Sequence, residues 1–321
     1  MLKIFSLLCA AVLLILDSRC AMDSAREALE LCGKTLIPGL FPLFVLSAML
    51  TPGLASVRIP FLSKLLGIPD GSEGVWLLGC AGGYPVGAAS VCQAYRSGSL
   101  DRTDAQRMLG LCSLCGPSFL FGAAASILSI KYAVLLFLIQ LEASILVGTS
   151  WPGKSDATCH PGKETISLTE AVRRSVGSML SVCAWVTLAA VTAGMLRRWL
   201  FPLLPSGICV LLTGLLELTN GVFSVATLPD GPRFLHCALF LSFGGASVLL
   251  QIHGLASAAG LSMVPCIAQK SIQALLTVLI SALCLRFGTA SLVLPLLLVF
   301  PKIAVAFPGK VLYNIRRKEG I

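Results

Sequence analysis

Long apolar stretches separated by short polar turns occupy almost the whole chain. The clearest apolar runs cover residues 4–16, 36–50, 74–93, 118–149, 176–200, 208–218, 234–259, 271–285 and 291–307. A helix needs about 20 apolar residues to cross a bilayer, and it pairs its own backbone polar groups there. The pattern therefore predicts an all-α, polytopic integral membrane protein.

The longest polar stretch falls near the middle of the chain and predicts a boundary between two membrane halves. Residues 150–170 contain the pairs Pro152-Gly153 and Pro161-Gly162, which favour turns. We expect an N-terminal membrane repeat over 1–150, a polar linker over 151–175 and a C-terminal membrane repeat over 176–321. The first helix of the C-terminal repeat is expected to begin near Val176.

Two apolar runs are interrupted by glycine pairs, which predicts broken or re-entrant helices. The first interruption reads Gly82-Gly83-Tyr84-Pro85-Val86-Gly87, and the second reads Gly244-Gly245-Ala246-Ser247-Val248. Glycine adopts backbone angles that other residues resist, and proline has no N–H to donate. Lipid cannot pair the backbone groups that such a break frees, so protein or a water-filled cavity must cover them. Breaks in corresponding halves therefore point to the binding site of a transporter.

The order of features is similar in the two halves. Gly82-Gly83 lies 162 positions before Gly244-Gly245, and Ala105-Gln106-Arg107 lies 163 positions before Ala268-Gln269-Lys270. Each half thus reads as a glycine break, an apolar run, a polar turn and a helix that opens with Ala-Gln and a cation. If each half crosses the membrane an odd number of times, the two are inverted repeats, an arrangement common in transporters.

Polar side chains beside the breaks are the candidate solute contacts. In the first half they are Tyr84 and, before a second break at Gly116-Pro117, Ser113. In the second half they are Ser247 and Gln251, one helical turn apart. With the backbone of the breaks, the candidate substrate site comprises Gly82, Gly83, Tyr84, Pro85, Gly87, Ser113, Gly116, Pro117, Gly244, Gly245, Ser247 and Gln251.

Each of these candidates also has a purely structural interpretation. Gly79, Gly83 and Gly87 form a ladder of small residues that lets membrane helices approach closely. Gly116-Pro117 fits an ordinary kink, since glycine and proline are common in membrane helices. A lone glutamine often only bonds a neighbouring helix. The sequence leaves both interpretations open.

A carboxylate at the end of another apolar run is a third candidate. Glu217 and Asn220 follow the apolar residues 208–216. A carboxylate at membrane depth is costly and by default functional, so this pair would bind a cation or a proton, or line the path. The alternative is a position at a helix end, in contact with headgroup water.

Composition and charge fit a membrane protein rather than a nucleic-acid-binding one. Hydrophobic residues make up 56% of the chain and charged residues 12%, with a mean hydropathy of +0.89, whereas a soluble domain carries roughly a quarter charged residues. The net charge of +9 comes from basic residues scattered between apolar spans, where such residues set orientation. Arg316-Arg317-Lys318 predict a cytoplasmic C-terminus. The expected partner is the lipid bilayer of the cell membrane.

No residue pattern predicts a metal, a cofactor or a catalytic site. Most of the 13 cysteines lie in apolar segments, and the close pair Cys112 and Cys115 has no second pair or histidines at zinc-binding spacing. His160, His236 and His253 also lack metal-like spacing. There is no His-Glu-x-x-His motif and no Gly-x-Ser with a plausible histidine base. We therefore do not expect an enzyme.

Two of the interrupted segments carry a family resemblance. Gly-Gly-Tyr-Pro-Val-Gly-Ala at 82–88 and Cys-Gly-Pro-Ser-Phe at 115–119, supported by residues 36–44, 214–221 and 242–251, resemble the family of the sporulation integral membrane protein YlbJ. That family belongs to the wider group with the nucleoside-recognition or Gate domain. The resemblance implies a multi-pass protein of endospore-forming bacteria that is associated with the spore envelope and cortex and moves a small molecule.

Two functions from different classes remain open at this stage. The first is a permease-like carrier of an unknown small solute, which would be held between the two breaks while one repeat rocks against the other. The second is a non-transporting membrane scaffold of an envelope assembly complex, in which the glycine breaks serve packing alone. Further copies of the chain or envelope proteins would be partners of such a scaffold.

Overall fold

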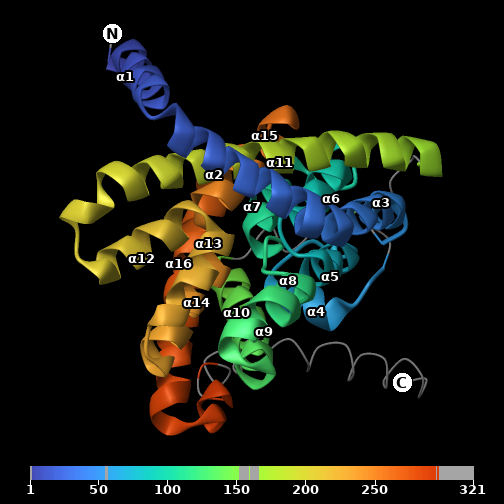
Figure 1. The fold of residues 1–321 in the computed structure, drawn as a ribbon. Coiled ribbons are helices and arrows are strands. Elements are labelled where there is room, and N and C mark those ends of the chain that lie inside the picture. The colour runs from blue at the N-terminus through green and yellow to red at the C-terminus, as the bar shows by residue number, and fades with distance from the viewer. Residues whose placement is uncertain (1, 55–56, 152–158, 160–165, 294, 296–321) are drawn as a thin grey trace, which may run out of the picture.

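The regular structure is entirely helical in the computed structural model, which describes residues 2–54, 57–151, 159, 166–293 and 295 (Figure 1). Five helices or nearly continuous helical stretches are long and apolar enough to cross a membrane. They are Ser18–Leu54, Ile130–Ser150, Leu168–Trp199, Asp230–Ala258 and Val264–Phe287. The all-α class and the multi-pass membrane assignment are thereby confirmed.

The N-terminal helices and one long central helix form a layer that lies across the rest of the molecule (Figure 1). Helix α1 (Leu2–Leu16) projects from one end, and α2 (Ser18–Leu31), the π turn η1 (Cys32–Leu36) and α3 (Ile37–Leu54) follow as one stretch. Helix α11 (Leu168–Trp199) packs against both α2 and α3. These segments are far apart in the sequence but form a single layer.

Two pairs of short helices form hairpins whose arms touch at glycines. Helices α5 (Glu73–Gly82) and α6 (Val86–Arg96) approach so closely that a Cβ on Gly87 would lie 2.9 Å from the Cα of Gly79. Helices α12 (Ser206–Leu216) and α13 (Leu218–Ser224) do the same, since a Cβ on Gly221 would lie 2.2 Å from the Cα of Gly214. Only small residues permit such contact between two helical backbones.

Two further helical stretches are interrupted without folding into hairpins. Helix α7 (Arg102–Leu111) ends before a non-helical segment, residues 112–116, and the chain resumes as α8 (Pro117–Phe119), η2 (Leu120–Ala124) and α9 (Ala125–Leu128). Helix α14 (Asp230–Phe243) is separated from α15 (Gly245–Ala258) by Gly244 alone. All of the interruptions predicted from glycine and proline are therefore present.

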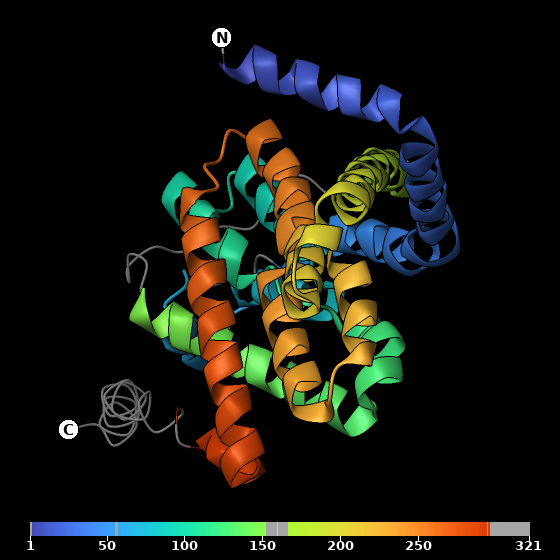
Figure 2. The same cartoon turned by 60° about the vertical axis from the view of Figure 1, so that its left-hand side comes forward.

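Helices from both halves share one packed interior. Helix α16 (Val264–Phe287) packs against α7, α14 and α10 (Ile130–Ser150), and Figure 2 shows its long course down one side of the molecule. Buried Leu109, Leu136 and Phe240 belong to this main core. The short connecting elements are α4 (Pro60–Leu66), η3 (Phe201–Leu203), η4 (Val225–Thr227) and η5 (Thr289–Leu292).

A second, smaller hydrophobic cluster joins the α2–α3 and α11 layer to the main core. Its members come from α2, η1, α3, α6 and α11, and they are Ala28, Cys32, Phe44, Val86, Met179, Val182, Val186 and Ala190. This cluster is distinct from the main core and lies where the layer packs against it. We call the boundary between the layer and the main core the seam.

The predicted start of one helix is wrong, and most of one predicted span lies outside the described residues. Helix α11 begins at Leu168 rather than near Val176, because the Ser167 hydroxyl accepts a hydrogen bond from the Glu170 N–H and caps the helix there. Residues 168–175, predicted as linker, are thus its first two turns. Most of the last predicted span, 291–307, and the basic C-terminus lie outside the described residues.

Candidate functional site

The tip of the first hairpin docks onto the interruption between α7 and α8. Gly83 has a φ of +68°, and a Cβ there would lie 2.3 Å from the backbone nitrogen of Gly116. The next residue, Tyr84, donates its N–H to the carbonyl oxygen of Leu114 at 2.7 Å. Glycine at position 83 is therefore required both by its backbone angle and by this close approach.

The second glycine pair lies beside the tip of the second hairpin. Gly244 and Gly245 have φ values of +91° and +71°, and a Cβ on Gly245 would lie 3.0 Å from the carbonyl oxygen of Gly214 in α12. Glu217 forms the tip of that hairpin and has extended backbone angles. In both halves, then, the interruption of a broken helix packs against the tip of a hairpin.

The two hairpin tips, the α7–α8 interruption and the first turns of α15 meet around one small central cavity of about 60 Å³. Its polar lining comes from the first tip (Tyr84), from α8 (Ser118), from the second tip (Glu217 and Thr219) and from α15 (Ser247 and Gln251). Leu36, Leu40, Val182 and Val186 of η1, α3 and α11 line the side of the cavity that faces the α2–α3 and α11 layer. A cavity of this size holds a few water molecules.

The structure brings together about half of the predicted site residues. Those that line the central cavity are Gly82, Tyr84, Pro85, Gly116, Ser247, Gln251 and Glu217. Those that do not line it are Gly83, Gly87, Ser113, Pro117, Gly244, Gly245 and Asn220. Gly83, Gly87 and Gly245 serve the close backbone packing described above, and Gly244 adopts a positive φ that favours glycine. The buried Ser113 hydroxyl donates to the carbonyl oxygen of Leu109.

Glu217 is a buried helix cap that faces two cavities. Its side chain is 2% exposed, and its carboxylate accepts hydrogen bonds from the N–H groups of Thr219 at 3.1 Å and Asn220 at 2.7 Å. These N–H groups stand at the start of α13 and have no carbonyl partner within the helix. The negative charge of Glu217 also lies at the positive end of the helix dipole. A second cavity of about 210 Å³, lined by Asn220, Glu27 and Arg197 among others, lies on its other side.

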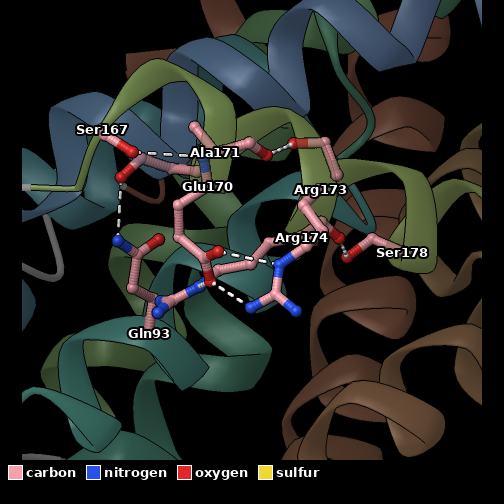
Figure 3. Close-up of polar contacts among 9 residues, drawn as sticks. Gln93, Ser167, Glu170, Ala171, Arg173, Arg174 and Ser178 are labelled. Carbon is pink, nitrogen blue, oxygen red and sulfur yellow. Dashed lines mark hydrogen bonds and ion pairs between the residues drawn. The ribbon is translucent and has the colours of Figure 1, made fainter.

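A third and larger cavity has an arginine-rich wall. Its volume is about 620 Å³, within the range of roughly 300–1,000 Å³ that is usual for ligand sites. Glu170 accepts hydrogen bonds from Arg173 at 2.8 and 3.0 Å and from Arg174 at 2.6 Å. Figure 3 shows these three side chains together, with Gln93 of α6 opposite them. With Arg96, the lining carries three guanidinium groups and one carboxylate.

The three cavities follow one another along α11. The arginine-lined cavity is bordered by Arg173 to Ser178, the central cavity by Val182 and Val186, and the Glu217 cavity by Val186 to Arg197. Helix α3 passes the arginine-lined cavity at Ala48 and the central cavity at Leu40, in the same order. All three cavities therefore lie in the seam between the α2–α3 and α11 layer and the main core.

The sequence pattern does not indicate that Lys270 is fully buried inside the protein. Lys270 is 0% exposed, and its Nζ donates to the carbonyl oxygen of Ser113 at 2.7 Å and to Oε1 of Gln273 at 3.1 Å. In the sequence it stands at the start of an apolar run, where a lysine usually flanks a membrane span. The glutamines Gln140, Gln269 and Gln273 around it were the signal that could have indicated a polar interior.

The described residues contain no group of three or more histidine, cysteine or acidic side chains that could hold a metal ion. The cysteines among them carry free thiols, and most are buried, including Cys80, Cys112 and Cys115. What the arrangement offers chemically is hydrogen bonding and fixed charge along a line of cavities.

The chain has a distant relative of known name. It is 27% identical over 135 residues to the sporulation integral membrane protein YlbJ of Bacillus subtilis (strain 168), a match that covers 38% of this chain and 33% of the relative. No protein-family model matches the chain, and no solved structure matches it. The chain is thus a multi-pass integral membrane protein that is distantly homologous to YlbJ.

Proposed function

We propose that the protein is a permease-like carrier of a small solute that acts in the formation of the spore envelope or cortex. The observation that supports this proposal is the convergence of the two hairpin tips, the α7–α8 interruption and the first turns of α15 on one small cavity. Interrupted helices leave backbone amides and carbonyls available to a solute, and carriers place their sites at such points. The spore association is proposed from the name of the relative.

A recurring order of helical elements supports the carrier proposal. The order hairpin, interrupted helix, long helix occurs as α5–α6, α7–α9 and α10, and again as α12–α13, α14–α15 and α16. This order pairs the Gly83 tip with the Glu217 tip and the Gly116 interruption with the Gly244 interruption. It differs from the pairing of Gly82-Gly83 with Gly244-Gly245 that the sequence favours. We propose that the two units are inverted repeats.

The seam is the proposed moving interface. Rocking of residues 1–150 against 176–321 would have to separate α16 from α7 and α10, which are packed together in the main core. Sliding of the α2–α3 and α11 layer along the seam would instead leave that core intact. Such a movement would connect the central cavity to the arginine-lined cavity or to the Glu217 cavity. The excess of guanidinium groups in the arginine-lined cavity favours a solute that carries a negatively charged group.

Gln251→Leu is expected to lower solute flux several-fold without lowering the amount of folded protein. Gln251 is 5% exposed and lines the central cavity, so leucine removes its hydrogen-bonding groups and keeps its approximate size. The measurement is uptake of candidate solutes into liposomes that contain the purified protein. Gln269→Leu is the matched control, because Gln269 is also buried but lies on α16 outside the cavity. Equal flux in both variants would remove Gln251 from the proposed site.

Flux measurements combined with pull-down experiments distinguish a carrier from a scaffold. The tight contacts Gly79–Gly87 and Gly214–Gly221 are what a rigid scaffold would also need. A scaffold would show envelope partners in pull-down experiments and no flux of any candidate solute. That result would replace the carrier proposal with the scaffold.

A further inference from the structure

A positively charged side chain lies inside the main core without a carboxylate to balance it. Lys270 is fully buried, and among the described residues no acidic side chain is within ion-pair distance of its Nζ. A buried charge is very costly unless polar groups replace the water around it. The polar groups around Lys270 therefore indicate which ligand this position can stabilise.

Three groups around Lys270 can interact favourably with its ammonium group. The carbonyl oxygen of Ser113 and Oε1 of Gln273 accept hydrogen bonds from Nζ at 2.7 and 3.1 Å. The ring of Tyr84 lies on another side, with its centroid 5.9 Å from Nζ, within the range of a cation–π contact. An ammonium group has three donors and no acceptor, so these contacts suit the charged form.

These contacts belong to the interruption between α7 and α8. Ser113 follows the end of α7, where backbone carbonyls lack helical partners and the helix dipole is negative. The same interruption is held by Gln140, whose Oε1 accepts the N–H of Cys115 at 3.1 Å. In carriers with broken helices, unwound carbonyls and the C-terminal ends of half-helices coordinate Na⁺ or a proton. Lys270 places its own charge at such a point.

We propose that Lys270 is a tethered cation that fills an internal site for a monovalent cation at the α7–α8 interruption. The ligands of that site are the Ser113 carbonyl and the Gln273 side chain, completed by water when the lysine is absent. These oxygens are neutral, so the site holds a single positive charge rather than a divalent ion. The native protein therefore needs no Na⁺ at this position, and a variant without the lysine binds Na⁺ there.

A consequence for transport rests on the proposed carrier function. If the protein carries a solute, its flux does not depend on Na⁺ at this site, because the ammonium group never leaves it. The cation site itself can be tested without any transport, by the thermal stability of the purified protein. The two proposals can thus fail separately.

The test compares the melting temperature of the full-length protein and two variants in NaCl and in choline chloride at equal concentration. The wild type should melt at the same temperature in both salts. Lys270→Ala should melt roughly 5 °C or more below the wild type in choline chloride, because buried acceptors lose their partner. NaCl should restore at least half of that loss with a saturating dependence on concentration.

Lys270→Met is the matched control, since it also removes the charge but fills the space that an ion would need. It should show the same loss in both salts. The proposal would be overturned if Lys270→Ala melted alike in both salts, if NaCl rescued Lys270→Met, or if NaCl stabilised the wild type as much as it stabilised Lys270→Ala. Failure of Lys270→Ala to fold even when it is purified in NaCl would also contradict it, because the ion should replace the lysine.

Discussion

Gly87→Ala should prevent the α5–α6 hairpin from forming and remove most of the folded protein. A Cβ at this position would lie 2.0 Å from the carbonyl oxygen of Cys112 and 2.9 Å from the Cα of Gly79. Both are backbone atoms, which cannot rotate away as a side chain can. Overpacking typically costs about 1–3 kcal/mol, and a clash with rigid backbone should reach or exceed the upper end. The measurement is the yield of monodisperse protein in detergent, together with its melting temperature.

Gly177→Ala in α11 is the control for that experiment. Nothing lies within 4 Å of the Cβ that this substitution adds, and alanine favours a helix over glycine by roughly 0.5–1 kcal/mol. Yield and melting temperature should therefore be unchanged or raised. If Gly87→Ala behaved like Gly177→Ala, the hairpin would not pack against residues 112–116 as described, and the tip would not be held at the central cavity.

Glu217→Ala should lower solute flux by roughly tenfold or more and destabilise the second hairpin by about 1–2 kcal/mol. The substitution leaves the N–H groups of Thr219 and Asn220 without the carboxylate that now accepts their hydrogen bonds. It also removes the one carboxylate shared by the central cavity and the Glu217 cavity. Flux into liposomes and the melting temperature are measured on the same preparation.

Glu217→Asp separates the two roles of this residue. Aspartate is a preferred N-terminal cap, so the melting temperature should return toward that of the wild type. A shorter side chain withdraws the charge from the cavities, so flux should stay low if the carboxylate contacts solute or a coupling ion. Wild-type flux in Glu217→Asp would reduce the residue to a structural cap, and wild-type behaviour of Glu217→Ala would remove both roles.

The sequence predicts the interruptions well because their cause is local. Gly83 and Gly244 adopt left-handed backbone angles that glycine favours, and Pro117 begins a helix as proline commonly does. Glu217 at a helix end was one of the two alternatives left open, and the structure places it there, although buried rather than in headgroup water.

Features that depend on long-range packing were not predictable from the sequence. The ladder of Gly79, Gly83 and Gly87 indicates a close helix contact, but the pattern does not show that Gly79 and Gly87 meet each other across a hairpin, nor that Gly214 meets Gly221. Lys270 looks like a flanking charge in the sequence, and only the fold places it beside Ser113, 157 residues away. The sequence marks the Ser113 hydroxyl as a candidate solute contact, whereas its backbone carbonyl accepts a hydrogen bond from Lys270. In each case the partner, rather than the residue itself, decides the role.

The most direct test of the account is the accessibility of a cysteine introduced at Ser247. Ser247 is 1% exposed and lines the central cavity, whereas the control residue Ser281 is 0% exposed and lies in α16 away from it. Each cysteine is placed in a background without reactive native thiols and treated with a small, membrane-impermeant thiol reagent. If the cavity opens to water as a carrier requires, Ser247→Cys reacts and Ser281→Cys does not. Equal inertness of both cysteines would contradict the account.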